Sequence, residues 1–212
     1  MQRNEAAILT GLAIAGAAAW TGTEYVLHRF LMHEARGRGL ASREHLSHHA
    51  DVTYFAPTDK KLLSAASTTA VVFPVANAAL GRRRATAFTG GLIGMYFIYE
   101  LLHRRAHTHP PATAYGRWMR RNHFDHHFGA PMRNHGVTTP VWDRLFGTAH
   151  DPGVVRVPRR MAPHWMLTAD GSLRPDLAGD YEVVGRDRLD PATVERDRVA
   201  AFANQAPEPS PV

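Results

Sequence analysis

The sequence predicts an all-α fold: a membrane-embedded helical bundle with a cytosolic, histidine-rich helical cap and a polar, partly disordered C-terminal tail. Three observations lead to this expectation. Long uncharged stretches fill much of the first half of the chain, histidine clusters border them, and the chain becomes rich in Pro, Asp and Arg from Asp151 onward. We therefore expect a membrane domain over residues 1–150 and a polar extension over residues 151–212, with a short helix from Asp190 to about Ala203.

Three stretches are apolar enough to enter or cross a membrane. They cover residues 6–23, 62–81 and 85–102. The first is 18 residues long, which as a helix reaches about 27 Å. Their many small residues leave buried helices of a soluble bundle as the alternative, and the arginines at 82–84 leave a re-entrant hairpin open. Pro74 is expected to kink the second stretch. The first lacks a strong basic leader, so we expect it to be retained rather than cleaved as a signal peptide.

Charge and composition narrow the function classes. The chain has 25 basic and 19 acidic residues, a formal net charge of +6 that suits anionic lipids or nucleic acid. The basic residues flank the apolar stretches and lack a stacking platform of aromatic residues, so no nucleic-acid partner is expected. Most of them lie on the side of the histidines, which the positive-inside rule then places in the cytoplasm. The absence of cysteine excludes disulfides, thiolate zinc sites and cysteine-held iron–sulfur clusters.

Histidine is concentrated in two blocks. Eleven of the 14 histidines fall within residues 28–49 and 103–127, and each block ends in the pattern H-x-x-H-H. Because positions i, i+3 and i+4 share one face of a helix, each such trio can point its imidazoles at a common point. His28 and His33, five residues apart, suit two nearby metals or a distorted helix end. Two matching blocks beside apolar stretches predict a dinuclear metal site.

The ligand type does not identify the metal, because imidazoles suit iron, zinc, copper or nickel. Iron is favoured, since two irons can activate oxygen and a membrane pocket offers an unactivated alkyl chain as the target. Two other classes stay open: a membrane haem-binding or metal-transport protein and a zinc hydrolase. Acidic residues near the histidines in sequence are candidates for orienting imidazole N–H groups: Glu24, Glu44, Glu100, Asp125 and Asp143. Aromatic residues that either line an acyl channel or simply pack are Phe30, Phe55, Tyr96, Phe97, Phe124, Trp142 and Phe146.

Residues 20–150 resemble the fatty acid hydroxylase and sterol desaturase superfamily. The resemblance rests on HRFLMH at 28–33, HLSHH at 45–49, HRRAH at 103–107, NHFDHH at 122–127 and the closing segment NHGVTTPVWDRLFGT at 134–148. It implies an oxygen-dependent centre of two metal ions, normally iron although zinc can occupy it in isolated protein, that hydroxylates or desaturates a lipid. The ligands that it implies are His28, His33, His45, His48, His49, His103, His107, His123, His126 and His127. It names no catalytic residue apart from the metal centre.

The remaining histidines carry weaker implications. His135 lies inside the closing segment and is expected to be an additional ligand or a pocket residue. Three others match no motif and are expected not to be ligands: His109, His150 and His164.

Two departures from the family pattern matter for electron supply and substrate. The run His109-Pro110-Pro111 lacks the glycines of a cytochrome b5 haem motif, so the electron donor, of ferredoxin or cytochrome type with a reductase, is expected to be a separate protein. Only 11 residues separate His33 from His45, a compactness that also resembles bacterial carotenoid ring hydroxylases. The closing segment favours the fatty acid and sterol branch. The expected protein is therefore an integral membrane lipid hydroxylase whose metal site faces the cytoplasm.

Overall fold

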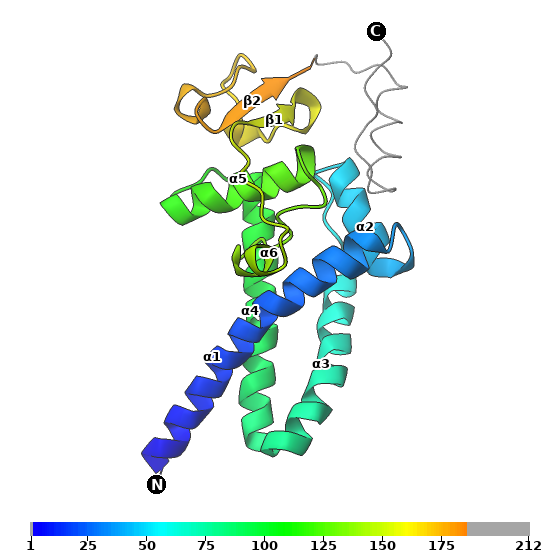
Figure 1. The fold of residues 1–212 in the computed structure, drawn as a ribbon, viewed down its shortest axis with the longest axis vertical. Helices are drawn as coiled ribbons and strands as arrows, with labels where there is room; N and C mark the ends of the chain where they lie inside the picture. The colour runs from blue at the N-terminus through cyan, green and yellow to red at the C-terminus, as the bar shows by residue number, and fades with distance from the viewer. Residues whose placement is uncertain (1, 186–212) are drawn as a thin grey trace. The chain divides into compact units, whose positions relative to one another are not determined.

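The computed structural model describes residues 2–185, and the contacts within it divide the chain into two compact units. The first unit comprises the residues up to Glu24 together with Ala56–Leu102, and the second comprises Tyr25–Phe55 together with the residues from His103 onward. The described chain is mostly helical (Figure 1), which confirms the predicted fold class. The boundary expected between residues 150 and 151 does not coincide with this division.

Three helices are long and apolar enough to cross a membrane, as the sequence predicts. In their most apolar windows, only 11% of the residues of the first and second spans and 28% of the third are buried. Apolar side chains on the outside of a helix suit lipid and disfavour the alternative of buried helices in a soluble bundle. The spans are Asn4–Glu34, which is α1 (Gln2–Val26) with the π-helix that follows it, Thr58–Leu80 (α3) and Arg82–Thr108 (α4).

Helices α3 and α4 of the first unit run in opposite directions (Figure 1), because Gly81 turns the chain between them. Its φ of 78° is a left-handed conformation that suits glycine. At the other end of the pair, Lys61 forms an ion pair with Glu100 at 2.5 Å, and its carbonyl accepts a hydrogen bond from the Tyr96 hydroxyl at 3.2 Å. Helix α3 continues through Pro74 without interruption.

Two glycines allow α1 and α4 to approach closely within the first unit. A Cβ atom on Gly16 would lie 1.9 Å from the carbonyl oxygen of Phe88, and one on Gly91 would lie 1.9 Å from that of Ala13. Small residues at such crossings let helix backbones approach, which is how apolar helices associate in lipid. The aromatic ring of Trp20 adds contacts with Tyr96 and Tyr99 of α4, with ring centroids 5.0 and 5.8 Å apart.

Replacement of Gly16 or Gly91 with alanine is expected to lower the free energy of unfolding by about 1–3 kcal/mol, because a rigid backbone atom occupies the space that a methyl group needs. The measurement is denaturant unfolding of the purified protein in detergent. Gly11→Ala and Gly94→Ala are matched controls, since nothing lies within 4 Å of either added Cβ. Equal effects at all four positions would contradict the close helix crossing.

The second unit is built from shorter elements. Helix α5 begins at its Thr113 cap, whose hydroxyl accepts a hydrogen bond from the Gly116 N–H at 3.0 Å. This helix lies at the centre of the unit, since it carries part of the second histidine block and packs against the first β-strand. The helical elements of this unit, apart from the ends of α1 and α4, are η1 (Leu27–Glu34, a π-helix), α2 (Gly39–Ala50), α5 (Ala114–Phe128), α6 (Val141–Leu145) and the 3₁₀ turns Arg159–Met161, His164–Met166 and Pro175–Leu177.

Residues 151–185 fold against α5 instead of forming the polar tail that the sequence suggests. Strands β1 (Val155–Pro158) and β2 (Tyr181–Val184) form a two-stranded parallel sheet, drawn in yellow and orange in Figure 1. The buried core that they share with α5 consists of Phe124, Val155, Val157, Trp165, Met166, Leu177 and Tyr181. The expectation of a tail is wrong for this segment because its apolar residues are widely spaced and their partner, Phe124, lies far away in sequence. The helix expected over residues 190–203 lies outside the described residues.

Candidate metal centre

The first histidine pair lies on the π-helix η1. Backbone hydrogen bonds in a π-helix join residues i and i+5, so residues five apart come to the same side. His28 and His33 therefore face one way, and both are buried. Of the two interpretations of this spacing, the distorted helix end is confirmed, since both imidazoles belong to one group. Single π-turns inside α-helices often mark functional sites.

Ten buried histidines converge in two groups of five, and within each group the potential ligand atoms lie within 4.8 Å of one another. All ten belong to the second unit. The first histidine group contains His28, His33, His45, His49 and His126. The second histidine group contains His48, His103, His107, His123 and His127. These are the ten residues that the sequence motifs single out as candidate ligands.

Each H-x-x-H-H motif divides its histidines between the two groups. On α2, His45 and His49 face the first group, whereas His48 faces the second. On α5 the pattern is reversed, because His126 faces the first group while His123 and His127 face the second. The prediction that each trio shares a common point is therefore wrong. The i and i+4 residues converge, and the i+3 residue crosses to the neighbouring group, which places the two groups side by side.

The spacing of the imidazole nitrogens suits a shared metal ion. In the first group, His45 Nε2 lies 3.0 Å from His28 Nε2 and 2.8 Å from His33 Nε2. In the second, His107 Nε2 lies 3.1 Å from His48 Nε2 and 2.8 Å from His123 Nε2. Two nitrogens that each lie about 2.0–2.1 Å from one metal, at right angles to each other, are about 2.9 Å apart.

Backbone carbonyls determine the tautomer of three of these histidines. His28 Nδ1 lies 2.5 Å from the carbonyl oxygen of His135, and His126 Nδ1 lies 2.7 Å from that of Arg133. His48 Nδ1 is likewise 2.7 Å from the carbonyl oxygen of Tyr54. Because a carbonyl only accepts, Nδ1 carries the proton and donates, which leaves the Nε2 lone pair directed into the group. Sequence motifs do not reveal such carbonyls, because any residue type can supply one.

Asp143 holds the turn that supplies one of these carbonyls. Its buried carboxylate accepts hydrogen bonds from the backbone N–H groups of His135 and Gly136, at 2.9 and 2.7 Å, and from the Thr148 hydroxyl at 2.8 Å. Burial by itself would raise the pKa of Asp143, but the donors outweigh burial and lower it below its usual range. Asp143 therefore acts on the first histidine group indirectly, because it holds the His135 carbonyl that accepts the hydrogen bond from His28 Nδ1.

Glu44 also acts one step away from a candidate ligand. Its carboxylate accepts a hydrogen bond from the Tyr54 hydroxyl at 2.5 Å, and the backbone carbonyl of Tyr54 accepts a hydrogen bond from His48 Nδ1. Glu44 thus supports the orientation of His48 through Tyr54.

The other acidic candidates have different surroundings. Asp125 accepts hydrogen bonds from the half-exposed His150 at 2.8 Å and from Asn134 at 3.0 Å, and neither residue belongs to the two groups. Glu24 and Glu100 belong to the first unit, where Glu100 pairs with Lys61. These partners of Asp125 and Glu100 are therefore residues outside the two histidine groups.

Burial keeps the imidazoles neutral and therefore able to bind a metal. Burial, and then the neighbouring histidines, lowers the pKa well below its usual value at His45, His49, His123, His126 and His127. Within residues 2–185, His49 Nε2 and both ring nitrogens of His127 are buried without a hydrogen-bond partner. A buried polar atom left unpaired costs about 1–3 kcal/mol. Converging, unprotonated and unpaired nitrogens fit transition-metal ions, one in each group.

The histidines outside the motifs behave differently. His135 is fully buried, and its ring centroid lies 5.5 Å from that of His28 and 5.5 Å from that of His126, yet it belongs to neither group. His135 therefore lies beside the first histidine group without being one of its five members. The three histidines expected not to be ligands also lie outside both groups: His109, His150 and His164.

The aromatic residues near the motifs have separate surroundings. Phe124 belongs to the core beneath the parallel sheet, so its role is packing. Phe55 lies against the second histidine group, with its ring centroid 5.3 Å from that of His48. Phe146 is half exposed and stacks on Tyr25 at 5.2 Å. Phe55 is therefore placed to shape a pocket beside the second histidine group.

The family model described as fatty acid hydroxylase matches residues 13–148, which include all ten converging histidines and Asp143. This chain belongs to the fatty acid hydroxylase family. With three helices able to cross a membrane, this fatty acid hydroxylase family member is an integral membrane protein.

Curated relatives of this family member are acyl hydroxylases. It is 28% identical over 149 residues to the dihydroceramide fatty acyl 2-hydroxylase FAH2 of Arabidopsis thaliana, covering 68% of this chain and 62% of the relative. It is 30% identical to the ceramide very long chain fatty acid hydroxylase scs7 of Schizosaccharomyces pombe, covering 64% and 41%. The fatty acid 2-hydroxylase of Mus musculus is 28% identical, with 66% and 40% covered. The family member thus spans less than two thirds of the length of these relatives.

A solved structure supports the fold. The structure described as full-length scs7p with only the hydroxylase domain visible matches this family member with a TM-score of 0.54 and 26% sequence identity. The match covers 68% of this chain and 57% of the other. The helical fold of this family member is therefore shared with a hydroxylase domain.

Proposed function

We propose that this protein hydroxylates the acyl chain of a membrane lipid, using O2 and electrons from a separate donor. The observation that carries the proposal is the pair of buried five-histidine groups in a chain of the fatty acid hydroxylase family. The relatives named above favour an acyl chain over a carotenoid ring. Five imidazoles in each group also exceed the one or two that haem iron requires, which disfavours a haem protein.

The two histidine groups are proposed to hold one iron ion each. Iron would supply oxygen activation and accept the electrons, which zinc cannot do because it has no redox chemistry. The chain's own contribution is to fix the ligands. The carbonyls that bind His28, His48 and His126 hold three imidazoles in the tautomer that presents Nε2. Burial keeps bulk water away from the centre, which protects a reactive site from side reactions.

The lipid is proposed to approach from the membrane beside α6. This helix leaves Val141, Leu145 and Phe146 half or more exposed, and Phe146 stacks on Tyr25 at the end of α1. Exposed apolar side chains next to a candidate membrane span suit contact with acyl chains. We propose that the acyl substrate reaches the histidine groups from this side.

The metal site is proposed to face the cytoplasm. Basic residues follow the first span and the third span, at Arg36, Arg38 and Arg43 and again at Arg117 and Arg121. Under the positive-inside rule the ends of these spans, which carry the histidines, lie on the cytoplasmic side. An electron donor of ferredoxin or cytochrome type, with its reductase, would then reach the protein from the cytoplasm.

The test is lipid mass spectrometry of cells grown under isotopically labelled dioxygen. Cells that express the protein are expected to contain lipids heavier by one labelled oxygen atom on an acyl chain. Cells that express the His48→Ala variant at equal levels are expected to lack them, because that variant loses a member of the second histidine group. If no lipid class gains labelled oxygen while the wild-type protein is present with its metal, the proposed function is wrong.

A further inference from the structure

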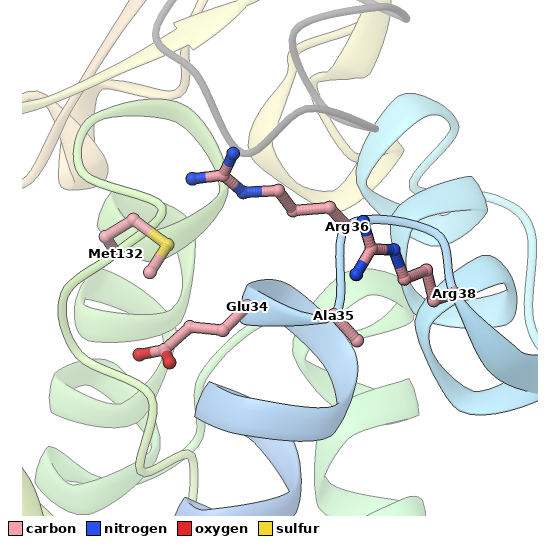
Figure 2. A pocket seen from close by; sticks show the side chains of 5 residues that line it. All are labelled: Glu34, Ala35, Arg36, Arg38 and Met132. Carbon is pink, nitrogen blue, oxygen red and sulfur yellow. The ribbon is translucent and has the colours of Figure 1, made fainter.

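A pocket of about 510 Å³ lies at the end of η1, outside the two histidine groups. It is lined by Glu34, Ala35, Arg36, Arg38 and Met132, and Figure 2 shows the two arginine side chains extending over it from the loop that follows η1. This volume lies within the range of about 300–1,000 Å³ that is usual for small-molecule pockets. Its size and its charged lining raise the question of which ligand it fits.

The lining of the pocket is positively charged. Arg36 and Arg38 are both exposed, and neither forms an ion pair within the part of the chain that the structure describes. The acidic lining residue Glu34 is already engaged, since it pairs with Arg29 at 2.9 Å. A guanidinium group presents a planar fork of donors that matches a carboxylate or a phosphate. The chemistry of the pocket therefore selects an anionic group.

The loop that carries the arginines is held in a costly conformation. Arg36 has a φ of 50°, in the left-handed region that residues other than glycine rarely adopt. The Ser42 hydroxyl fixes this loop, because it accepts a hydrogen bond from the Gly37 N–H at 2.8 Å and donates to the Met32 carbonyl at 2.7 Å. Backbone strain of this kind persists where the surrounding structure enforces it and is common at ligand sites. Here it holds Arg36 against the pocket.

The position of the pocket in the chain connects it to both the membrane and the first histidine group. The candidate span Asn4–Glu34 ends at the pocket, so its arginines follow the point where the chain leaves the apolar layer and reaches the level of lipid headgroups. Two of its lining residues are also neighbours in sequence of residues at the first histidine group. Glu34 directly follows His33, and Met132 directly precedes Arg133, whose carbonyl binds His126.

We propose that this pocket binds the acidic headgroup, a phosphate or a carboxylate, of the lipid substrate. That this lipid is the substrate rests on the proposed function, whereas the binding of an anionic lipid does not. Arg36 and Arg38 bind the anionic group, and the apolar atoms of Ala35 and Met132 contact the start of the lipid chain. The headgroup is thereby fixed beside the first histidine group, so the pocket selects anionic lipids over neutral ones.

The test measures binding without turnover, by microscale thermophoresis of the purified full chain in uncharged detergent. The probes are dioctanoyl phosphatidic acid, octanoate, uncharged dioctanoylglycerol and inorganic phosphate. An acidic lipid is expected to bind at least about tenfold more tightly than dioctanoylglycerol, because hydrogen bonds to charged groups contribute that much. Arg36→Gln/Arg38→Gln is expected to raise the Kd for the acidic lipid by about tenfold or more. Arg82→Gln/Arg83→Gln removes the same charge from the exposed first turn of α4 and is expected to change nothing.

Several results would overturn the proposal. Equal binding by the wild type and the Arg36→Gln/Arg38→Gln variant, equal binding of the uncharged lipid, or no binding of either acidic lipid would each do so. Inorganic phosphate that binds as tightly as phosphatidic acid would identify a site for soluble anions instead of lipids. Binding that behaves as expected while no lipid is hydroxylated in cells would leave the pocket standing and contradict the proposed function. Hydroxylation with an unchanged KM in Arg36→Gln/Arg38→Gln would contradict the pocket alone.

Discussion

Replacement of His126 with alanine is expected to abolish lipid hydroxylation and to reduce the metal content from two ions per chain to one or fewer. His126 Nε2 lies 3.0 Å from His33 Nε2 in the first histidine group, and His126 Nδ1 donates a hydrogen bond to the Arg133 carbonyl. Loss of a residue that merely orients a ligand costs about 10–100-fold in metal affinity, so loss of a ligand is expected to exceed about a hundredfold. Elemental analysis of the purified variant gives the metal content, and labelled-oxygen incorporation gives the activity.

His48→Ala and His164→Ala complete this experiment. His48→Ala removes a member of the second histidine group from the same motif and should also lose metal and activity. His164→Ala is the matched control, because His164 is exposed and belongs to neither group. If His126→Ala keeps both metal ions and full turnover, His126 is not a ligand. If His164→Ala loses as much metal as His126→Ala, the loss of metal is not specific to members of the histidine groups.

Asp143→Asn is expected to weaken metal binding in the first histidine group by about 10–100-fold and to leave the second group loaded. Asparagine has nearly the same volume but only one accepting oxygen, so it cannot receive all of the N–H and O–H groups that Asp143 binds at His135, Gly136 and Thr148. The His135 carbonyl then no longer holds the His28 imidazole. The free energy of unfolding is expected to fall by about 2–3 kcal/mol, since hydrogen bonds to a buried charge are lost.

The ratio of metal in the two groups separates positioning from a general loss of stability. Metal titration of the metal-free Asp143→Asn variant should give one tight and one weakened site, whereas the wild type gives two tight sites. Asp151→Asn is the control, because Asp151 is exposed and its carboxylate accepts from the Gly153 N–H at 3.4 Å. Equal weakening of both sites in Asp143→Asn would mean that Asp143 supports the fold of the whole unit and does not position His28.

The helical part of the fold could be predicted from the sequence because its signals are local. Uncharged stretches predict α1, α3 and α4, and the structure has helices over all three. The sheet of the C-terminal segment could not be predicted in this way. Val155 and Tyr181 face each other across 25 intervening residues, and their core partner Phe124 comes from a helix that the motifs associate with metal binding. Such long-range contacts leave little periodicity in either segment.

The ten members of the two histidine groups could also be predicted, but their division between the groups could not. Spacing predicts that His45, His48 and His49 point at a common site, whereas the structure separates His48 from the other two. The decision between two neighbouring groups depends on how α2 and α5 pack, and no local spacing records that. The π-turn at His28 and His33 is indicated in the sequence by their spacing, since a pair five residues apart fits an ordinary α-helix poorly. The carbonyls that orient the imidazoles left no side-chain signal at all.

The central claim is that the ten histidines hold two metal ions, one in each five-histidine group. Its most direct test is anomalous diffraction from crystals of the purified protein, recorded at the absorption edge of the metal that elemental analysis finds. The predicted result is two anomalous peaks per chain, one among His28, His33, His45, His49 and His126 and one among His48, His103, His107, His123 and His127. A single peak shared by both groups, or peaks outside them in metal-loaded protein, would contradict the account.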